Sequence, residues 1–434
     1  MPFEQSVGAR AKIAVVGGGI SGMGAAFALS NSHDITLYEA EPRLGGHART
    51  ILAGKRGDQP VDTGFIVFNY ANYPEMADLF ARLDVPVTKS NMSFGASIGG
   101  GKLEYGLASL DALFAQRRNA VNPRFLGMVR DIVRFNKHAL RVANEDRTRS
   151  IAAFLDVMGT GEWFRDYYLL PLSGAIWSTP TEKIMDFPAH AMMQFFENHA
   201  LLHHTGQHQW HTVDGGSIQY VGRLEAAMMS AGVEIRKGTG VQAVRRTPLG
   251  VELKAWGGDW TAYDKVIFAT HSDDTLRILE DPDPVERQAL GAIAYQPNDI
   301  VLHADTSIMP QHRQVWSSWV YTEDAQVQSD RIDLTYWMNS LQPIPESDPH
   351  FVTLNTKRTI REELIYDQVT LRHPVYDLAA LDAQETLRVH NGSNNTWFCG
   401  AWMRHGFHED GLASAMDVAR AITANVMSAQ VAAE

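Results

Sequence analysis

The chain has 434 residues, of which 45% are hydrophobic and 20% are charged, and its formal net charge is −12. This composition is that of a soluble globular protein with room for two or more packed domains. The acidic balance argues against a nucleic acid partner, because phosphate binding needs a concentrated basic surface. The single cysteine, Cys399, excludes a disulfide framework and any multi-cysteine metal site. We expect no signal peptide and no membrane-spanning helix, since no apolar run approaches about 18 residues, and we expect a cytoplasmic location.

The first element in the chain is a predicted strand that leads into a glycine-rich turn. Residues 12–16 read KIAVV, and GGGISG and a helical apolar pattern follow at once. This order is typical of a dinucleotide-binding unit, in which the glycines allow a tight turn and close approach of a pyrophosphate. The N–H groups at the start of the helix would then face the phosphates. The candidate cofactor residues in this turn are Gly17, Gly19, Ile20, Ser21 and Gly22.

A second predicted strand, DITLYEA at 34–40, ends in a carboxylate where such a unit needs one. Glu39 lies 17 residues after Gly22, which is the place of the acid that binds the adenosine ribose. The next segment, AEPRLGGHART, adds a glycine pair whose backbone can pass close to a phosphate, together with a basic side chain that can neutralise it. The candidates in this segment are Glu39, Ala40, Arg43, Gly45 and Gly46.

These motifs resemble those of the flavin-containing amine oxidase and phytoene desaturase superfamily, in which an acid and a Gly-Gly-basic segment contact FAD. VDTGFIVFN at 61–69 matches the next flavin-side segment of that family, and His47 stands where the family usually has arginine. Residues 214–279 and 396–426 also follow the order of the superfamily. The resemblance implies FAD as the cofactor and adds these candidate contacts: His47, Asp62, Gly64, Phe65, Val241, Ala269, Thr270, Gly400 and Ala401.

The resemblance also implies an α/β fold, with a Rossmann-type FAD-binding domain and an interleaved α+β substrate domain that contains an antiparallel sheet. We assign residues 1–69, 214–289 and 381–434 to the FAD-binding domain, and residues 70–213 and 290–380 to the substrate domain. The first insertion is predicted to be mostly helical. The second contains four strand-like pieces, DIVLHADT, QVWSSWVYT, RIDLTYWMN and HFVTLNT, which predict the antiparallel sheet.

The first insertion contains an unusually basic stretch. Between positions 117 and 149, nine Lys or Arg face three Asp or Glu, a local charge of +6. The apolar residues of this stretch, among them Phe125, Ile132 and Val133, fall largely on one side of a helix near 122–142. A basic amphipathic helix is typical of contact with an anionic membrane surface. A helix that packs on its own domain and exposes a solvated basic face explains the pattern equally well.

The stretch NHALLHHTGQHQWH contains five histidines, with His199 and His203 four residues apart. That spacing could bind a metal, but no H-E-x-x-H pattern and no carboxylate partner accompanies it. We therefore predict no metal site. The histidines are expected to line a cavity wall or to lie on the surface.

The last motif is GFHEDG at 406–411, between a predicted strand at 396–399 and an apolar helix that begins near Leu412. We interpret the motif as a helix entry, in which Asp410 can cap and Gly411 lets the backbone approach the isoalloxazine. Free N–H groups at that end would stabilise negative charge on the reduced flavin. The candidate cofactor residues are His408, Asp410, Gly411, Leu412 and Ser414, and the candidate bases are His408, Glu409 and His199.

Several segments resemble one subgroup of the superfamily, the FAD-dependent proteins that accompany cyclopropane-fatty-acid-synthase-like methyltransferases. These segments include SGAIWSTP, FFENHALL, QWHTVDGGSIQYV, TWFCGAW and GFHEDG. The subgroup includes a bacterial desaturase of furan fatty acid synthesis. The resemblance implies desaturation of a methylated unsaturated phospholipid acyl chain, with a lipid methyltransferase as partner and peripheral contact with the inner face of the membrane. Three alternatives stay open: a flavin amine oxidase, a redox-neutral lipid isomerase, and a non-catalytic flavoprotein partner of a methyltransferase.

Overall fold

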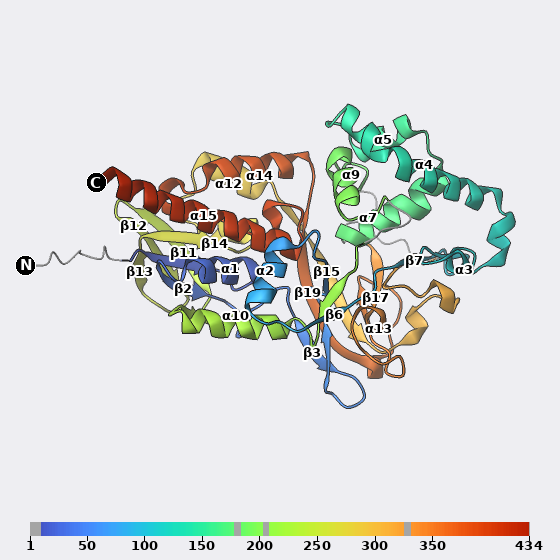
Figure 1. Ribbon diagram of the computed structural model, residues 1–434, viewed down its shortest axis with the longest axis horizontal. Coiled ribbons are helices and arrows are strands. Elements are labelled where there is room, and N and C mark those ends of the chain that lie inside the picture. Colours follow the sequence, from blue (N-terminus) through green and yellow to red (C-terminus); the bar gives the residue numbers. More distant parts are fainter. Residues whose placement is uncertain (1–9, 178–183, 203–207, 325–330, 434) are drawn as a thin grey trace, which may run out of the picture.

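The structure, a computed structural model, describes residues 10–177, 184–202, 208–324 and 331–433. Two parts lie side by side in Figure 1. One contains α1 (Ile20–Leu29) and α15 (His408–Ala433), and the other ends in α4 (Pro123–Glu145) and α5 (Ile151–Met158).

A five-stranded parallel sheet is the centre of the first part. All four of its strand pairings are parallel. The predicted strands at 12–16, 34–40 and 396–399 are confirmed as members of this sheet. Because its strands are parallel, their carboxyl ends meet at one edge, where ligands of such sheets bind. The strands, in spatial order, are β10 (Glu234–Arg236), β2 (Asp34–Tyr38), β1 (Lys12–Val16), β14 (Lys265–Phe268) and β20 (Thr396–Phe398).

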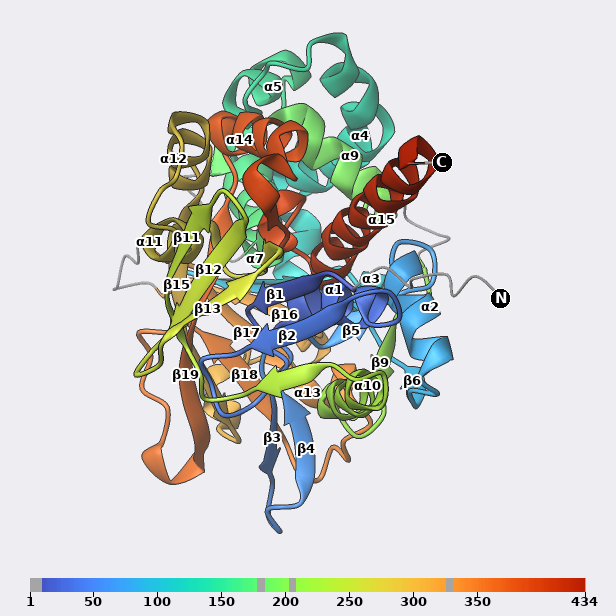
Figure 2. The ribbon, with the colours of Figure 1, turned by 90° about the vertical axis from the view of Figure 1, so that its left-hand side faces the viewer.

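Side chains of β1 alternate between two cores. Ile13 and Val15 pack on the side of α1, α15 and α10 (Ile218–Ser230). Ala14 and Val16 pack on the opposite side, which a three-stranded antiparallel sheet covers. Figure 2 shows the three-stranded sheet and the helices on the two sides of β1 and β2. Burial on both faces explains why KIAVV is continuously apolar. The covering strands are β11 (Val241–Thr247), β12 (Gly250–Ala255) and β13 (Trp260–Tyr263).

A seven-stranded sheet dominates the second part. The four predicted strand pieces become β15, β16, β17 and β18, and their mutual pairings are antiparallel, which confirms the predicted sheet. The first insertion, predicted to be mostly helical, also contributes β7 and β8, and β7 pairs with β16 in parallel. In spatial order the strands are β19 (Ile365–Val375), β15 (Ala294–His303), β18 (Phe351–Leu354), β17 (Asp333–Trp337), β16 (Trp319–Thr322), β7 (Phe94–Ile98) and β8 (Leu103–Gly106).

Two small strand groups pair separately from these sheets. One is the antiparallel pair β3 (Thr50–Ala53) and β4 (Gln59–Asp62). In the other, β9 (His211–Val213) pairs with both β5 (Val67–Phe68) and β6 (Val87–Lys89).

The predicted basic helix is α4, and its apolar side chains face the protein interior. Phe135 is fully buried and contacts Phe154 of α5, Phe164 of α6 (Glu162–Phe164) and Phe196 of α9 (Ala189–Asn198). Of the two interpretations of this helix, packing of its apolar side on its own domain is confirmed, because protein side chains cover that side, and contact of the exposed face with a membrane stays a prediction. Val133, which was assigned to the same side, is instead 52% exposed.

The remaining α-helices are shorter than α4. Among the described residues, no helix combines the length and the apolar character that crossing a bilayer requires. The remaining α-helices, all shorter than α4, are α2 (Pro74–Arg82), α3 (Leu110–Leu113), α7 (Leu170–Trp177), α11 (Ser272–Ile278), α12 (Pro284–Gly291), α13 (Met338–Leu341) and α14 (Leu378–His390).

Candidate functional site

The glycine turn after β1 has room for a ligand at one glycine and none at the other two. A Cβ at Gly17 or Gly22 would lie 2.8 or 1.8 Å from a backbone oxygen, whereas one at Gly19 would have no atom within 4 Å. Gly19 is the N-cap of α1, which has no side-chain cap and no acidic residue in its first turn. The N–H groups of that turn, which contains Ile20 and Ser21, are therefore available to an anion such as a pyrophosphate.

The second predicted glycine pair lies directly against this opening. Gly45 forms an isolated bridge with Gly19, and a Cβ at Gly46 would lie 3.1 Å from the Cα of Gly19. The guanidinium of Arg43 donates to the carbonyl of Gly46 at 2.9 Å. Arg43 thus holds the shape of the loop that would face a phosphate.

Glu39 follows β2 at the same edge of the sheet. Its two carboxylate oxygens accept the N–H groups of Gly18 at 2.6 Å and Glu41 at 2.7 Å. Its own carbonyl accepts the N–H of Thr239 at 2.8 Å, which brings the chain just before Val241 beside Glu39 and Ala40. The residues predicted for the adenosine end are therefore neighbours, although they come from segments 200 residues apart.

The ends of β14 and β20 complete this edge. Trp402 donates its indole N–H to the carbonyl of Thr270 at 3.0 Å. The N–H of Gly400 donates to Ser414 Oγ at 2.9 Å, which ties the strand end and the following turn η7 (Ala401–Met403) to α15. A Cβ at Gly400 would lie 2.4 Å from Trp402, so the close turn needs a glycine. Ala269 and Ala401 lie in the same two loops.

Asp62 lies in a buried hydrogen-bond network that the sequence did not predict. Its buried carboxylate accepts the hydroxyl of Thr50 at 2.6 Å, the N–H and hydroxyl of Ser217 at 2.9 and 2.7 Å, and the amide of Gln342 at 3.0 Å. Burial raises the pKa of Asp62 to about 6. This carboxylate therefore joins β4 to α10 and to the end of α13. Sequence reasoning missed the roles of Thr50, Ser217 and Gln342. Thr50 and Ser217 lie in the segments AEPRLGGHART and QWHTVDGGSIQYV, but no local pattern indicates that these side chains meet Asp62.

Three histidines gather beside the glycine loops. The ring of His47 lies 5.9 Å from that of His271 and 5.5 Å from that of His373, between centroids. Burial lowers the pKa of all three, to about 3 for His271 and His373. They are therefore neutral at pH 7. Nε2 of His47 lies 3.2 Å from the carbonyl of Arg372, which requires a proton on Nε2 and leaves Nδ1 as the acceptor.

The position of the family arginine is thus filled by a neutral imidazole. Its neighbour Gly64 is essential to this arrangement, because a Cβ there would lie 1.9 Å from the carbonyl oxygen of His47. The segments ATHSDDTLRIL and HPVYD, which contain His271 and His373, follow the order of the superfamily, but nothing in them indicates a contact with His47. Only the fold brings them to His47.

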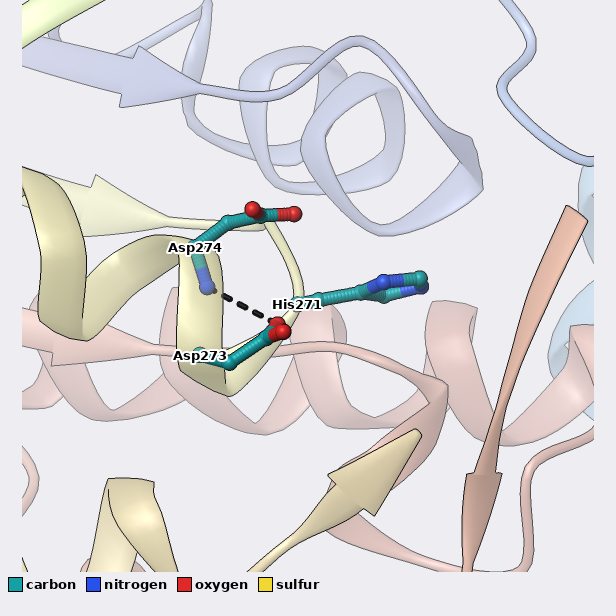
Figure 3. Close-up of side chains that lie close together, drawn as sticks. All are labelled: His271, Asp273 and Asp274. Atoms are coloured by element: carbon teal, nitrogen blue, oxygen red, sulfur yellow. Dashed lines mark hydrogen bonds between the residues drawn. The ribbon is translucent and has the colours of Figure 1, made fainter. Parts of the chain in front are cut away.

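His271 also belongs to a group of possible metal ligands, with Asp273 and Asp274 at the start of α11. Figure 3 shows its imidazole extending away from that helix, and the N–H of Asp274 bonded to Asp273. Arg372 forms ion pairs with both carboxylates, and Arg277 forms a further ion pair with Asp274 at 2.9 Å, so cations already balance the two acids. A second group of possible metal ligands among the described residues consists of Asp283, Glu286 and His390. Its two carboxylates already form the capping box of α12. His203 of the predicted pair lies outside the described residues.

The GFHEDG motif begins α15 four residues earlier than expected, at His408. The carboxylate of Asp410 accepts the N–H of Phe407 at 2.9 Å, so it caps from inside the first turn. His408 stacks on Phe65, with ring centroids 4.1 Å apart, and its Nε2 lies 2.5 Å from the hydroxyl of Tyr220. Burial lowers the pKa of His408 to about 3. The imidazole is therefore neutral and accepts a hydrogen bond from the hydroxyl of Tyr220. Its ring faces α10 and not α9.

Glu409 and Gly411 have packing roles in this structure. The carboxylate of Glu409 accepts the N–H groups of Glu75 and Met76 at 2.9 Å each, at the start of α2. A Cβ at Gly411 would lie 2.9 Å from Ser21 Oγ, and Leu412 is buried against α1. The close approach that Gly411 permits in the described chain is therefore between α15 and α1. Glu409 acts as the cap of α2.

His199 lies in a group of aromatic side chains where α9 meets the start of α15. Its ring stacks on Phe195 at 3.8 Å, and the rings of Phe407 and Trp210 lie 5.8 and 6.4 Å away. Nδ1 lies 2.9 Å from the carbonyl of Phe195, so it carries the proton and Nε2 is the acceptor. Burial lowers the pKa of His199 to about 4. We refer to Phe195, His199, Trp210 and Phe407 as the aromatic wall.

Comparison with known proteins gives the same cofactor as the site geometry. The profile of the family described as flavin containing amine oxidoreductase matches residues 20–304, more than half of the chain. No curated protein sequence matches. Among solved structures, cyclohexylamine oxidase from Brevibacterium oxydans IH-35A is 15% identical, with 96% of this chain and 100% of that chain covered and a TM-score of 0.70. The CLA-producing fatty acid isomerase from P. acnes is 14% identical, with 94% and 97% covered and a TM-score of 0.65.

At this identity the solved structures establish the fold, and the family profile gives FAD as the cofactor. The residues present fit a dinucleotide, because Gly19 leaves open space and the uncapped N-terminus of α1 would offer N–H groups to its phosphates. The chain belongs to the flavin-containing amine oxidoreductase family and is an FAD-dependent oxidoreductase.

Proposed function

We propose that this protein desaturates a methylated unsaturated acyl chain of a phospholipid. An allylic C–H pair would be removed as a hydride and a proton, which leaves a second double bond in the chain. FAD, when bound, supplies the two-electron acceptor that takes the hydride at N5. The protein would contribute an apolar surface for the chain and a group that accepts the proton.

The observation that carries this proposal is the aromatic wall beside the start of α15. Four rings, contributed by α9, the chain before β9 and the entry to α15, lie against one another there. Such a surface suits a hydrocarbon chain, which is positioned by shape because it offers few polar groups.

A protonated amine would instead need an available carboxylate or an open aromatic cage. Two carboxylates in the first turn of α15, directly after Phe407 of the wall, are already engaged, since Glu409 caps α2 and Asp410 accepts the N–H of Phe407. The wall itself is closed by ring stacking at 3.8 and 4.8 Å. These contacts favour an uncharged substrate.

Among the three candidate bases, His199 has the suitable geometry. Its Nδ1 proton is held by the carbonyl of Phe195, which presents Nε2 as a proton acceptor. His408 already accepts from Tyr220, and both oxygens of Glu409 already accept backbone N–H groups. We therefore assign proton acceptance to His199.

One anaerobic experiment tests the proposal. The FAD-loaded protein is mixed with a phospholipid that carries a methyl-branched unsaturated chain, and the flavin absorbance is followed. Bleaching with a product two mass units lighter supports desaturation. An isobaric product without bleaching indicates isomerisation, and bleaching by amines alone indicates an amine oxidase; either result overturns the proposal. The same phospholipid with a saturated, unbranched chain is the control, because it has no allylic hydrogen to lose.

The proposed substrate also implies a partner reaction. A methyl branch on an acyl chain comes from methyl transfer to a double bond, so a lipid methyltransferase would supply the substrate. A protein that binds such a methyltransferase but leaves the flavin oxidised with every lipid and amine would instead be a non-catalytic partner.

A further inference from the structure

We propose that the surface formed by residues 107–141 docks on an anionic phospholipid bilayer. This surface comprises the turn before α3, α3 itself, η1 (Arg117–Val121) and the outward face of α4. It lies at the end of the molecule opposite to the C-terminal end of α15 (Figure 1). The inference stands on exposure and charge alone, so it holds or fails independently of the reaction proposed above.

Exposed apolar side chains are concentrated on the 107–141 surface. Of the sixteen large hydrophobic residues that are exposed in the described chain, five lie between positions 107 and 133. An even spread would place about one residue in a segment of this length. These side chains and their exposed fractions are Leu107 (39%), Leu110 (75%), Val121 (83%), Leu126 (43%) and Val133 (52%).

The same surface is strongly basic. Residues 107–141 contain seven arginines and lysines and only two acids, a local charge of +5 in a chain of net charge −12. One of the acids, Asp131, is buried and accepts the N–H of Gly161 at 2.9 Å. The other, Asp111, pairs with Arg117. The cations Arg124, Arg134 and Lys137 are exposed.

The charge distribution orients the molecule toward a membrane. The remainder of the chain carries −17, the difference between −12 and +5. An anionic bilayer would therefore attract the 107–141 surface and repel the rest. Because the inward face of α4 is packed on the protein, this surface would lie on the lipid headgroups as a rigid platform, with its leucine and valine side chains reaching the acyl boundary.

A bilayer matches the mixture of groups better than an acidic protein partner does. The cations and apolar residues alternate along three successive elements, and Arg130 and Arg117 are 76% and 71% exposed at the side chain. A planar interface that is anionic outside and apolar inside satisfies both kinds of group over the whole length at once.

Cosedimentation with vesicles tests the proposal on the FAD-loaded protein. We expect binding to vesicles of phosphatidylcholine mixed with phosphatidylglycerol, and much weaker binding to phosphatidylcholine alone. Binding should fall when salt rises from about 0.1 M to about 1 M, because the Debye length shortens from about 10 Å to about 3 Å. Equal binding to both vesicles, or no binding to either at low salt, overturns the proposal; the second result would point to an acidic protein instead.

Two variants and a matched control locate the binding surface. The triple variant Arg124→Gln, Arg134→Gln, Lys137→Gln should lower the partition coefficient by about fivefold for each cation, or about a hundredfold in total. The variant Leu110→Ser, Val121→Ser should weaken binding to anionic vesicles without changing its salt dependence. The control removes the same charge from exposed positions elsewhere, at Arg223, Arg287 and Lys357.

The control variant should bind as the unmodified protein does, and a loss equal to that of the triple variant would place the contact elsewhere. Thermal unfolding and the absorbance of bound FAD verify that each variant is folded. Vesicle binding and these folding checks do not depend on turnover. A protein that binds vesicles but does not reduce its flavin with the lipid substrate would overturn the proposed reaction and leave the docking surface in place.

Discussion

The hydroxyl of Tyr220 lies 2.5 Å from Nε2 of His408, in the interior between α10 and the first turn of α15. Burial raises the pKa of Tyr220 and lowers that of His408 to about 3, so both groups are neutral at pH 7 and the tyrosine donates. The ring of Phe65 stacks on the imidazole at 4.1 Å. His408 is thus held in one orientation by the flavin-binding part of the molecule.

Replacement of Tyr220 by phenylalanine should destabilise the protein. The substitution removes the hydroxyl group that donates to Nε2 of His408. A buried acceptor without a donor lowers the free energy of unfolding by about 1–3 kcal/mol. Denaturant unfolding measures the loss. Tyr70→Phe is the control, because Tyr70 is 55% exposed and should tolerate the change. Equal stability of the Tyr220 variant and the unmodified protein would mean that the short contact contributes nothing.

Two glycines in the turn after β1 should respond to alanine in opposite ways. At Gly19 a Cβ would meet no protein atom within 4 Å and the backbone φ is −74°, so Gly19→Ala should leave the stability of the FAD-free protein unchanged. The methyl group would occupy space needed by the pyrophosphate, and the Kd for FAD should rise at least about tenfold, or about 1.4 kcal/mol.

Gly22→Ala should instead destabilise the fold itself, because the new Cβ would lie 1.8 Å from the carbonyl oxygen of Gly17. Gly222→Ala, on the exposed side of α10, is the control and should stabilise by up to about 1 kcal/mol. Unfolding without FAD and FAD titration separate these effects. Normal FAD affinity in the Gly19 variant would show that the phosphates lie elsewhere.

Asp62→Asn should weaken the junction between the two parts of the molecule. The carboxylate accepts four donors from Thr50, Ser217 and Gln342, and an amide would direct its own N–H groups at some of them. Leaving such groups unpaired in the interior costs about 2–5 kcal/mol. Denaturant unfolding of Asp62→Asn, Gln342→Leu and the double variant measures the coupling, with exposed Asp58→Asn as the control. Additive effects of the two substitutions would contradict a shared junction.

Local sequence patterns were sufficient for the nucleotide edge of the sheet. The apolar run 12–16 and the spacing of Gly17, Gly19 and Gly22 predict β1 and its turn, because both signals are contained in one short continuous segment. The start of α15 was placed too late, since Glu409 and Asp410 suit a helix N-terminus equally well before or inside the first turn.

Contacts between distant segments could not be predicted in the same way. The bond between Asp62 and Gln342 joins residues 280 positions apart, and nothing near either residue indicates the other. The parallel pairing of β7 with β16 could not be predicted for the same reason, because the two strands are far apart in the sequence. The apolar side of α4 shows a further difficulty, because helical periodicity predicts that a face is covered without stating whether protein or lipid covers it.

Substitution of the candidate bases should separate a catalytic role from a capping role. Glu409→Gln should cost about 0.5–2 kcal/mol of stability, as for the loss of a helix cap, and leave the rate of flavin reduction unchanged. His199→Gln should lower that rate by about 10²–10⁴-fold, the usual contribution of a general base. His211→Gln, a histidine on β9 that contacts Phe68 and Tyr70, is the matched control. A rate loss in the Glu409 variant alone would reverse the assignment.

The stability of the protein should fall steeply as the pH drops below about 6.5. His303 is fully buried, accepts the N–H of Asp305 at 3.1 Å and lies 2.8 Å from the hydroxyl of Thr353, and burial lowers its pKa to about 4. Between these two pH values the unfolded chain binds a proton at this histidine and the folded chain does not, so acid favours unfolding by about 1.4 kcal/mol per pH unit.

His303→Gln should therefore reduce the slope of unfolding free energy against pH by about 1.4 kcal/mol per unit between about pH 6.5 and 4, whatever it does to stability at pH 7. Denaturant unfolding at several pH values gives both slopes. Asp62 opposes this trend, because its raised pKa of about 6 makes the folded chain bind a proton that the unfolded chain releases above its ordinary value of 3.8. The comparison of two slopes cancels that contribution, since Asp62 is present in both proteins. Identical slopes would show that His303 is protonated in the folded state.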